Sequence, residues 1–441
     1  MLADSLFGYH ANLAVRSFRR NKVLTALMVL AIALGIGAAM TTLTVFHVLS
    51  GDPIPQKSHQ LFYPRIDPRS MNGYTPGEDP EPQLTRFDAE AMLRDKRGDR
   101  QAMMTGGGMA VQSEDGKVEP FLVSSRYTTA DFFPMFDAPF RHGAGWGAAD
   151  DQARARVAVI SQALNDKLFG GGNSVGKTVM AGRTPLRVVG VLDAWRPTPK
   201  FYDLTNSRFS EVEQVFVPFS TARELDLPTQ GNMNCWGNPG DDTEGARGPN
   251  APCAWLQYWV ELDSPAKVAA YRQYLADYSD AQRRAGRFER PNNVRLDDVM
   301  GWLENEGAVP GDVRLQMWLA MGFLLVCLVN TVGLLLAKFL RRAPEIGVRR
   351  ALGASRRAIF AQCLVEAGAV GIAGGIAGLG LALLGLWAVR QQPADYAELA
   401  RLDVPMLLVT LVLAVVASLL AGLVPAWRAM QVTPAIQLKT Q

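Results

Sequence analysis

Four long apolar stretches stand out from an otherwise mixed pattern of apolar and polar residues. Each is long enough to cross a bilayer, which takes about 20 apolar residues in a helix. We expect membrane spans at residues 23–48, 314–337, 358–389 and 404–427. A cleaved signal peptide is the alternative for the first span, but its apolar run is too long and too far from the N-terminus for one.

The region between the first two spans, residues 49–313, carries short strand and helix patterns that intermingle. "QALNDKLFG" indicates a helix that ends at a glycine, "TPLRVVGVLDAW" alternates like a strand, and "PAKVAAYRQYLADYSDAQRRAG" is typical of a long helix. The predicted fold class is therefore an α-helical membrane protein of four spans with a large α+β domain. A helix that begins near Asp312 is expected to run into the second span as a stalk.

The placement of Lys and Arg predicts the orientation of the chain. Basic residues precede the first span and crowd the link 338–357, whereas the link 390–403 is mainly acidic. Residues 1–22, 338–357 and 428–441 are therefore expected in the cytoplasm, and residues 49–313 in the periplasm of a bacterium with an inner membrane. The net charge of +3 comes largely from these flanks, which argues against nucleic-acid binding. Residues 1–22 are either an amphipathic helix in the membrane interface or a simple basic flank.

Two cysteines, Cys235 and Cys253, lie in the predicted outer domain within a loop rich in Gly, Pro and Asp. An oxidising compartment favours a disulfide between them, with two unpaired thiols as the alternative. Closing a loop of this length contributes about 3 kcal/mol on chain-entropy grounds.

The stretch "GGGNSVGKT" matches the P-loop pattern for nucleotide phosphates through Gly171, Gly176, Lys177 and Thr178. A P-loop needs a strand before it and a helix that begins at the Lys-Thr pair. Here a helix pattern precedes the glycines and a strand pattern follows them, and the topology places Lys177 outside the cytoplasm. We interpret the match as a glycine-rich turn.

Other catalytic and metal-binding motifs are missing from the sequence. The four histidines are scattered, no His-Glu-x-x-His is present, and no serine lies in Gly-x-Ser-x-Gly. We therefore expect no catalytic residue, no metal site and no cofactor on this chain.

Polar and small residues within the spans are candidate functional positions. Asn330 lies in the second span, and Glu366 lies near the cytoplasmic edge of the third, where it either pairs with a basic neighbour or extends to the interface. Overlapping Gly-x-x-x-Gly pairs suit close helix packing, within one subunit or between two: Gly371 with Gly375 and Gly374 with Gly378.

The link 338–357 has the pattern of a short amphipathic helix. Glu345 lies at its start, where a carboxylate favours the positive end of a helix, and Gly353 is placed to end it. Such a helix is placed to transmit a push from a soluble partner. The alternative is a basic loop that binds anionic lipid headgroups.

The same link resembles the loop of the MacB/FtsX-like ABC transporter permeases, Arg-x-x-Glu-Ile-Gly-[Ile/Leu/Val]-Arg-x-Ala-Leu-Gly-Ala. Glu366 and Asn330 fall on further positions of the pattern, and "VAVISQALNDKLFGGGNSVGKTVMAGRTPLRVVGVL" resembles the family's periplasmic core. Pro344 departs from the pattern, where a basic or polar residue is usual. The residues that match in the link are Arg342, Glu345, Ile346, Gly347, Val348, Arg349, Ala351, Leu352, Gly353 and Ala354.

The resemblance implies a non-catalytic permease subunit of the mechanotransmission type. It implies a dimer with a second copy or a paralogue, and a separate cytoplasmic ATPase, holding ATP and Mg²⁺, that docks on residues 345–354, Arg350 included. Similarity to macrolide-type exporters further implies a periplasmic adaptor and an outer-membrane channel. Three alternatives stay open: a lipoprotein-releasing permease, a division-type regulator of periplasmic cell-wall hydrolases and a membrane-anchored sensor.

Overall fold

The computed structural model describes residues 22–113, 118–206, 208–239, 244–393 and 396–431. The expected helix at residues 1–22 therefore lies almost entirely outside the described residues. The chain divides into two compact units, one formed by residues 1–50 with 309–441 and the other by residues 51–308.

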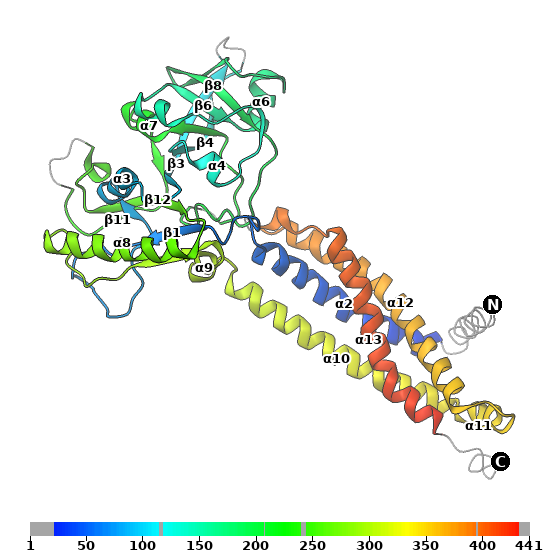
Figure 1. Ribbon diagram of the computed structural model, residues 1–441. Helices are drawn as coiled ribbons and strands as arrows, with labels where there is room; N and C mark the ends of the chain where they lie inside the picture. The colour runs from blue at the N-terminus through cyan, green and yellow to red at the C-terminus, as the bar shows by residue number, and fades with distance from the viewer. Residues whose placement is uncertain (1–21, 114–117, 207, 240–243, 394–395, 432–441) are drawn as a thin grey trace. The chain divides into compact units, whose positions relative to one another are not determined.

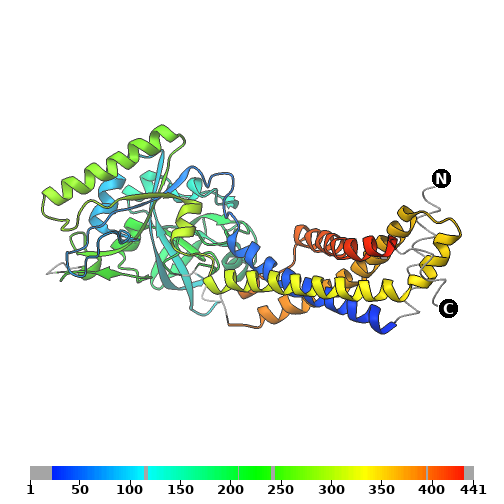
Figure 2. The same cartoon turned by 90° about the horizontal axis from the view of Figure 1, so that it is seen from below.

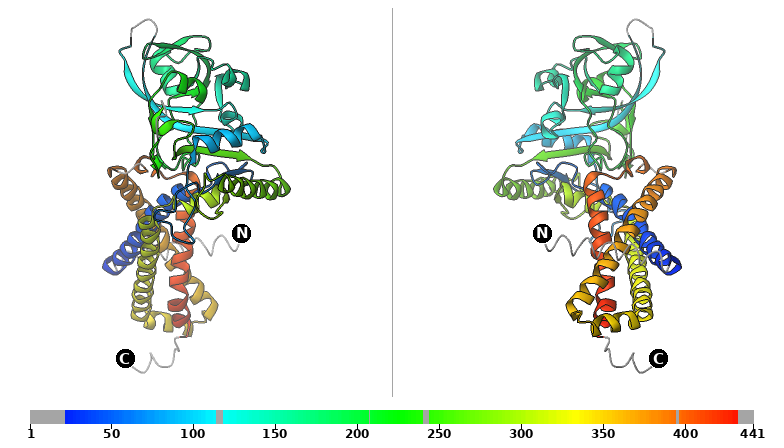
Figure 3. Two further views of the ribbon diagram at one scale, coloured as in Figure 1. Left: turned by 90° about the vertical axis from the view of Figure 1, so that its left-hand side faces the viewer. Right: turned by 90° about the vertical axis from the view of Figure 1, so that its right-hand side faces the viewer.

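Within its described residues, the helical unit contains four helices long and apolar enough to cross a membrane (Figure 1). They run alongside one another in Figures 2 and 3, and the buried side chains between them are mostly apolar. Two of the links between these long helices contain a short helix. The elements are α2 (Lys22–Ser50), α10 (Gly311–Arg341), α11 (Ala343–Ala351), α12 (Arg356–Arg390), η2 (Ala397–Leu399) and α13 (Val404–Met430).

Polar side chains define where two of these helices begin. The Ser355 hydroxyl accepts a hydrogen bond from the Ala358 amide at 3.2 Å, and the Asp403 carboxylate accepts one from the Met406 amide at 2.9 Å. Each bond satisfies one of the amides that a first helical turn leaves free. The starts of α12 and α13 thus follow from these caps.

The second unit is built on one large sheet with the strand order β13-β1-β12-β3-β4-β9-β6-β8-β5. The β4–β9 and β6–β8 pairs are parallel and the other pairs along this path are antiparallel. The strands are β1 (Leu61–Arg65), β2 (Leu84–Thr85), β3 (Arg100–Ser113), β4 (Phe121–Thr128), β5 (Phe140–Gly143), β6 (Val157–Ile160), β7 (Thr178–Ala181), β8 (Thr184–Leu192), β9 (Val215–Pro218), β10 (Thr229–Gln230), β11 (Asn234–Cys235), β12 (Cys253–Glu261) and β13 (Arg295–Asp298).

Helices and two separate apolar cores cover this sheet. The long α8 buries Tyr271 and Leu275 against the first core, while Trp259 and Trp302 are buried in the second. The unit is thus an α+β domain, as its sequence pattern predicts. Its helices are α3 (Arg86–Asp95), α4 (Phe132–Met135), α5 (Ala148–Gln152), α6 (Gln162–Phe169), α7 (Phe219–Glu224), η1 (Gly245–Arg247), α8 (Pro265–Arg284) and α9 (Val299–Asn305).

Candidate functional site

The short helix α11 lies across one end of the helical unit, between α10 and α12 (Figure 1). Pro344 and Glu345 are in its first turn, where a missing amide hydrogen is tolerated and a carboxylate is favoured. Gly353 has a φ of 99°, and its amide donates to the Arg350 carbonyl at 3.1 Å. The helix therefore ends beside the predicted glycine, and Pro344 begins it without disrupting α10.

The apolar side chains of α11 divide between two faces. Ile346 is 8% exposed and packs into the apolar core of the helical unit, and Gly347 is buried beside it. Val348 is 55% exposed, and Leu352, the residue directly after the helix, is 82% exposed. One face of α11 is thus anchored, and the other presents apolar surface.

A buried ion cluster lies directly behind α11. Glu366 on α12 accepts hydrogen bonds from Lys338 at 2.7 Å and from Arg342 at 2.9 Å. Lys338 is completely buried and also approaches the hydroxyl of Thr25 on α2, at 3.4 Å. Because an ion in an apolar interior is stable only when it is paired, these contacts hold α2, α10 and α12 in one arrangement.

The cluster continues outward into α11. Arg342 contacts Glu345 at 3.4 Å, and Glu345 accepts a hydrogen bond from Arg349 at 2.7 Å. Arg349 in turn donates to Gln362 on α12 at 3.1 Å. The matched residues Arg342, Glu345, Arg349 and Glu366 thus form one connected set, which ties α11 to the helices behind it.

Lys338 is the member of this cluster that the sequence analysis missed as a site residue. In the sequence it belongs to the basic link 338–357, but in the structure it lies at the end of α10 with its side chain buried. The available signal was periodicity, since Thr331, Leu335 and Lys338 follow one another at the spacing of a helix face and all three are buried.

The other predicted intramembrane positions lie elsewhere. Asn330 is exposed on the surface of α10. Gly371 and Gly375 face α13, where added Cβ atoms would come within 2.0 Å of Ser418 and 2.6 Å of Ala414. Gly374 and Gly378 face α2 and would meet Ile32 and Ile36. Both glycine pairs therefore serve packing within one chain.

In the second unit, Cys235 and Cys253 are joined by a disulfide across the β11–β12 pair. The stretch with Gly171, Gly176, Lys177 and Thr178 connects α6 to β7. Thr178 begins a strand that pairs antiparallel with β8, and the Lys177 ammonium lies 5.1 Å from the centre of the Phe169 ring. The stretch has the geometry of a turn before a strand, as predicted.

Comparisons with known proteins agree with this architecture. The profile of the MacB-like periplasmic core domain matches residues 25–278, and that of the FtsX-like permease C-terminal domain matches residues 317–434. The chain belongs to the MacB/FtsX-like ABC transporter permease family. It is therefore a membrane protein with a periplasmic domain, and residues 51–308 form the body of that domain.

Several relatives of this permease are named exporters. It is 25% identical to the pyoverdine export ATP-binding/permease protein PvdT of Pseudomonas entomophila, over 96% of this chain and 58% of that protein. It is 27% identical to the macrolide export ATP-binding/permease protein MacB of Rhodospirillum rubrum, over 99% of this chain and 61% of that protein. The chain thus spans about three-fifths of the length of these relatives.

Solved structures also resemble the permease. The periplasmic region of MacB from Actinobacillus actinomycetemcomitans superposes with a TM-score of 0.36 and 13% identity, covering 58% of this chain and 97% of that one. The extracellular domain of the transporter YknZ from Gram-positive bacteria gives a TM-score of 0.35 and also 13% identity, covering 54% of this chain.

Proposed function

We propose that this permease couples ATP hydrolysis by an ABC ATPase to a conformational change in its periplasmic domain. The ATPase docks on the exposed face of α11, where Val348 and Leu352 present apolar surface. The observation that supports the proposal most directly is the connected ion cluster. A push on α11 reaches α10 and α12 through Arg342 and Glu366, because these contacts are short and largely buried.

The proposed orientation follows the distribution of Lys and Arg, with α11 and both ends of the chain in the cytoplasm. We propose that the ATP- and Mg²⁺-binding domain belongs to a separate chain, and that a second permease copy or a paralogue completes the assembly. The named relatives are themselves described as ATP-binding/permease proteins, and a fused ATPase domain is the alternative arrangement.

The names of the relatives support export as the direction of transport. In this scheme the periplasmic domain handles a substrate already in the periplasm, with a periplasmic adaptor and an outer-membrane channel completing the path. The membrane helices pack around an apolar core. In this scheme no substrate passes between them, and they transmit motion from the ATPase to the periplasmic domain.

Co-purification tests the docking step. The full chain, expressed in its own host, is expected to retain an ABC ATPase, and Leu352→Asp and Glu345→Lys are each expected to abolish that retention. Leu122→Asp is the matched control, because Leu122 is 83% exposed but lies on β4 of the periplasmic domain. Equal ATPase retention in all three variants would contradict the proposal.

A further inference from the structure

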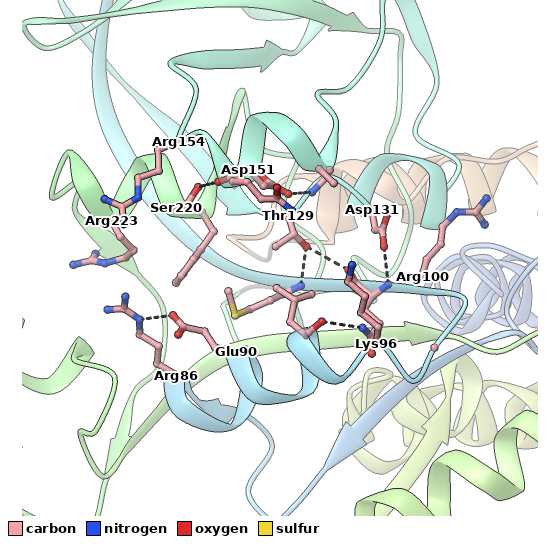
Figure 4. Close-up of a pocket in the computed structure, with 18 of the residues that line it drawn as sticks. Arg86, Glu90, Lys96, Arg100, Thr129, Asp131, Asp151, Arg154, Ser220 and Arg223 are labelled. Atoms are coloured by element: carbon pink, nitrogen blue, oxygen red, sulfur yellow. Dashed lines mark hydrogen bonds and ion pairs between the residues drawn. The ribbon is translucent and has the colours of Figure 1, made fainter.

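The periplasmic domain contains a cavity of about 750 Å³ that the coupling proposal does not use. In Figure 4, α3 borders it on one side, and Asp151, Ser220 and Arg223 from the other side face it. Its lining comes mainly from α3, the start of β3, the residues just after β4, α5 and α7. A volume of this size matches a site for a small organic molecule and is far too large for a single ion.

Several cations of the lining are already neutralised within the protein. Arg86 pairs with Glu90 at 2.7 Å and with Glu244 at 2.8 Å, and Arg223 pairs with the same Glu244 at 3.0 Å. Lys96 is exposed at the end of α3, and in the described part of the chain it forms no ion pair with Asp99, Asp131 or Asp151, the three aspartates of the lining. An anionic ligand would therefore have to displace existing ion pairs at the arginines.

Two aspartates of the lining are not neutralised by an ion pair among the described residues. The Asp151 carboxylate accepts hydrogen bonds from the Ala130 amide at 2.7 Å and the Trp146 indole at 2.9 Å, and Asp131 accepts one from the Gln101 amide at 3.0 Å. Among the residues that the structure describes, no Lys or Arg forms an ion pair with Asp131 or Asp151. Arg100 of the same lining pairs with Glu261 at 2.9 Å, and this hydrogen bond raises the pKa of Arg100, with the charge of Asp131 adding to the effect. The cavity therefore contains two carboxylates without an ion-pair partner of their own.

A third acceptor of the lining has no partner at all. Gln101 is 5% exposed, and its side-chain amide donates to the Leu93 carbonyl at 3.4 Å. Its Oε1 atom is buried and receives no hydrogen bond from any residue within the described ranges. Because a buried acceptor without a donor is costly, a ligand N–H group would satisfy this oxygen, and the Gln101 side chain has to turn toward the cavity to receive it.

We propose that the cavity binds an organic ammonium ligand, with its N–H groups on Asp131, Asp151 and Gln101 and its apolar body beside Leu93, Met103 and Phe219. An ammonium group supplies up to three donors and one positive charge, which match the acceptors present. A metal ion fits less well, because no group of three or more candidate ligands occurs among the described residues.

Burial supports this assignment. It raises the pKa of Asp151 to about 6, with the charges of Asp131 and Asp150 adding to the effect. A carboxylate in such surroundings is stabilised by an incoming cation, which lowers its pKa again on binding. If the coupling proposal is also correct, the ligand class is that of the exported substrate, but binding itself does not depend on coupling.

The test uses the full chain in detergent and dansylcadaverine, a fluorescent probe with a primary ammonium group and an apolar body. Its N-acetylated form is the neutral control, which also measures partition into the detergent. We expect saturable binding of the amine, and binding of the acetylated form weaker by about tenfold or more, the usual value of one charge-assisted hydrogen bond.

Conservative variants locate the site. Asp131→Asn keeps an acceptor for the backbone N–H of Gln101. Gln101→Met removes the unpartnered side-chain oxygen and keeps a side chain of similar length. Each is expected to weaken probe binding by about fivefold or more, whereas Asp277→Asn on the exposed face of α8 leaves it unchanged. Equal affinity for both probe forms, or full binding in both cavity variants, overturns the proposal. Glu345→Lys is expected to lose the ATPase and keep probe binding, which separates the two proposals.

Discussion

Lys338 on α10 and Glu366 on α12 form an ion pair with their charged atoms 2.7 Å apart, and both side chains are almost completely buried. Arg342, also at the end of α10, contacts the second carboxylate oxygen of Glu366 at 2.9 Å. The two cations are four residues apart and so lie on one helix face. Glu366 is therefore the common partner of two basic residues. Removing Glu366 breaks both ion pairs, whereas removing one basic residue breaks only one of them.

This difference predicts unequal effects of removing the members of the cluster. Glu366→Gln removes the carboxylate that Lys338 and Arg342 share, and it is expected to destabilise the helical unit by about 3 kcal/mol or more, because the buried Lys338 loses its 2.7 Å ion pair. Lys338→Met leaves Glu366 paired with Arg342, so its effect is expected to be less than half as large. Thermal unfolding of the purified full chain in detergent measures both.

The double variant Lys338→Met with Glu366→Gln supplies the control. It removes the buried ammonium together with the carboxylate that it pairs with, so it is expected to be more stable than Glu366→Gln alone. If Lys338→Met instead destabilises the chain more than Glu366→Gln does, the arrangement inferred for the cluster is wrong.

Close packing of α12 against α13 gives a second prediction. A Cβ atom at Gly371 would come within 2.0 Å of the Ser418 side chain, whereas one at Gly380, on the same helix, has no neighbour within 4 Å. Gly371→Ala is therefore expected to destabilise the helical unit by about 1–3 kcal/mol. Gly380→Ala is the matched control and is expected to be neutral or slightly stabilising. Equal unfolding temperatures for the two variants would contradict the close contact.

Features that depend on a single segment could be predicted from the sequence. The apolar runs indicated four membrane-spanning helices, and α11 follows from Pro344, Glu345 and Gly353, which begin and end it. In each case the signal is local, because it comes from hydrophobic length, helix capping or turn chemistry.

Features that depend on how distant segments meet could not be predicted. The role of Lys338 depends on the rotation of α10 toward α12, which a run of apolar residues does not specify. The cavity combines Gln101 on β3, Asp131 after β4 and Asp151 on α5, which meet through the pairing of β3 with β4 and the hydrogen bond from the Ala130 amide to Asp151. The spacing of Thr331, Leu335 and Lys338 indicates that Lys338 lies on a buried helix face but does not identify its partner, and no sequence pattern indicates the cavity.

The disulfide supports a third prediction. Cys235 and Cys253 are 18 residues apart, and Cys253 is completely buried at the start of β12. Replacing both by Ser is expected to lower the stability of the periplasmic domain by about 3 kcal/mol, because the unfolded chain gains the freedom of an open loop. The unfolding temperature of the full chain measures the loss. A reducing agent is expected to lower the wild-type value toward that of the variant and to leave the variant unchanged.

A pH dependence of ligand binding follows from Asp151, whose pKa is raised to about 6 by burial and by the nearby Asp131 and Asp150. From pH 7.5 to 5 the carboxylate becomes mostly protonated, while a primary ammonium probe stays charged. Binding of dansylcadaverine is therefore expected to weaken by up to about tenfold over this range. Most other charged groups of the lining are held in ion pairs: Arg86 with Glu90, Arg223 with Glu244, Arg154 with Glu224, Arg100 with Glu261, and Asp99 with Lys267. Lys96 is exposed at the end of α3.

Unfolding does not account for such a loss of binding. A carboxyl group whose pKa is raised from 3.8 on folding stabilises the folded state most at low pH, and that contribution disappears as the pH rises through about 6. Acidification to pH 5 thus strengthens this contribution to folding while it weakens binding. Asp151→Asn is expected to bind the probe weakly at every pH, and Gln101→Met to keep the pH dependence at lower affinity. A wild-type affinity that is constant between pH 5 and 7.5 would show that Asp151 does not contact the ligand.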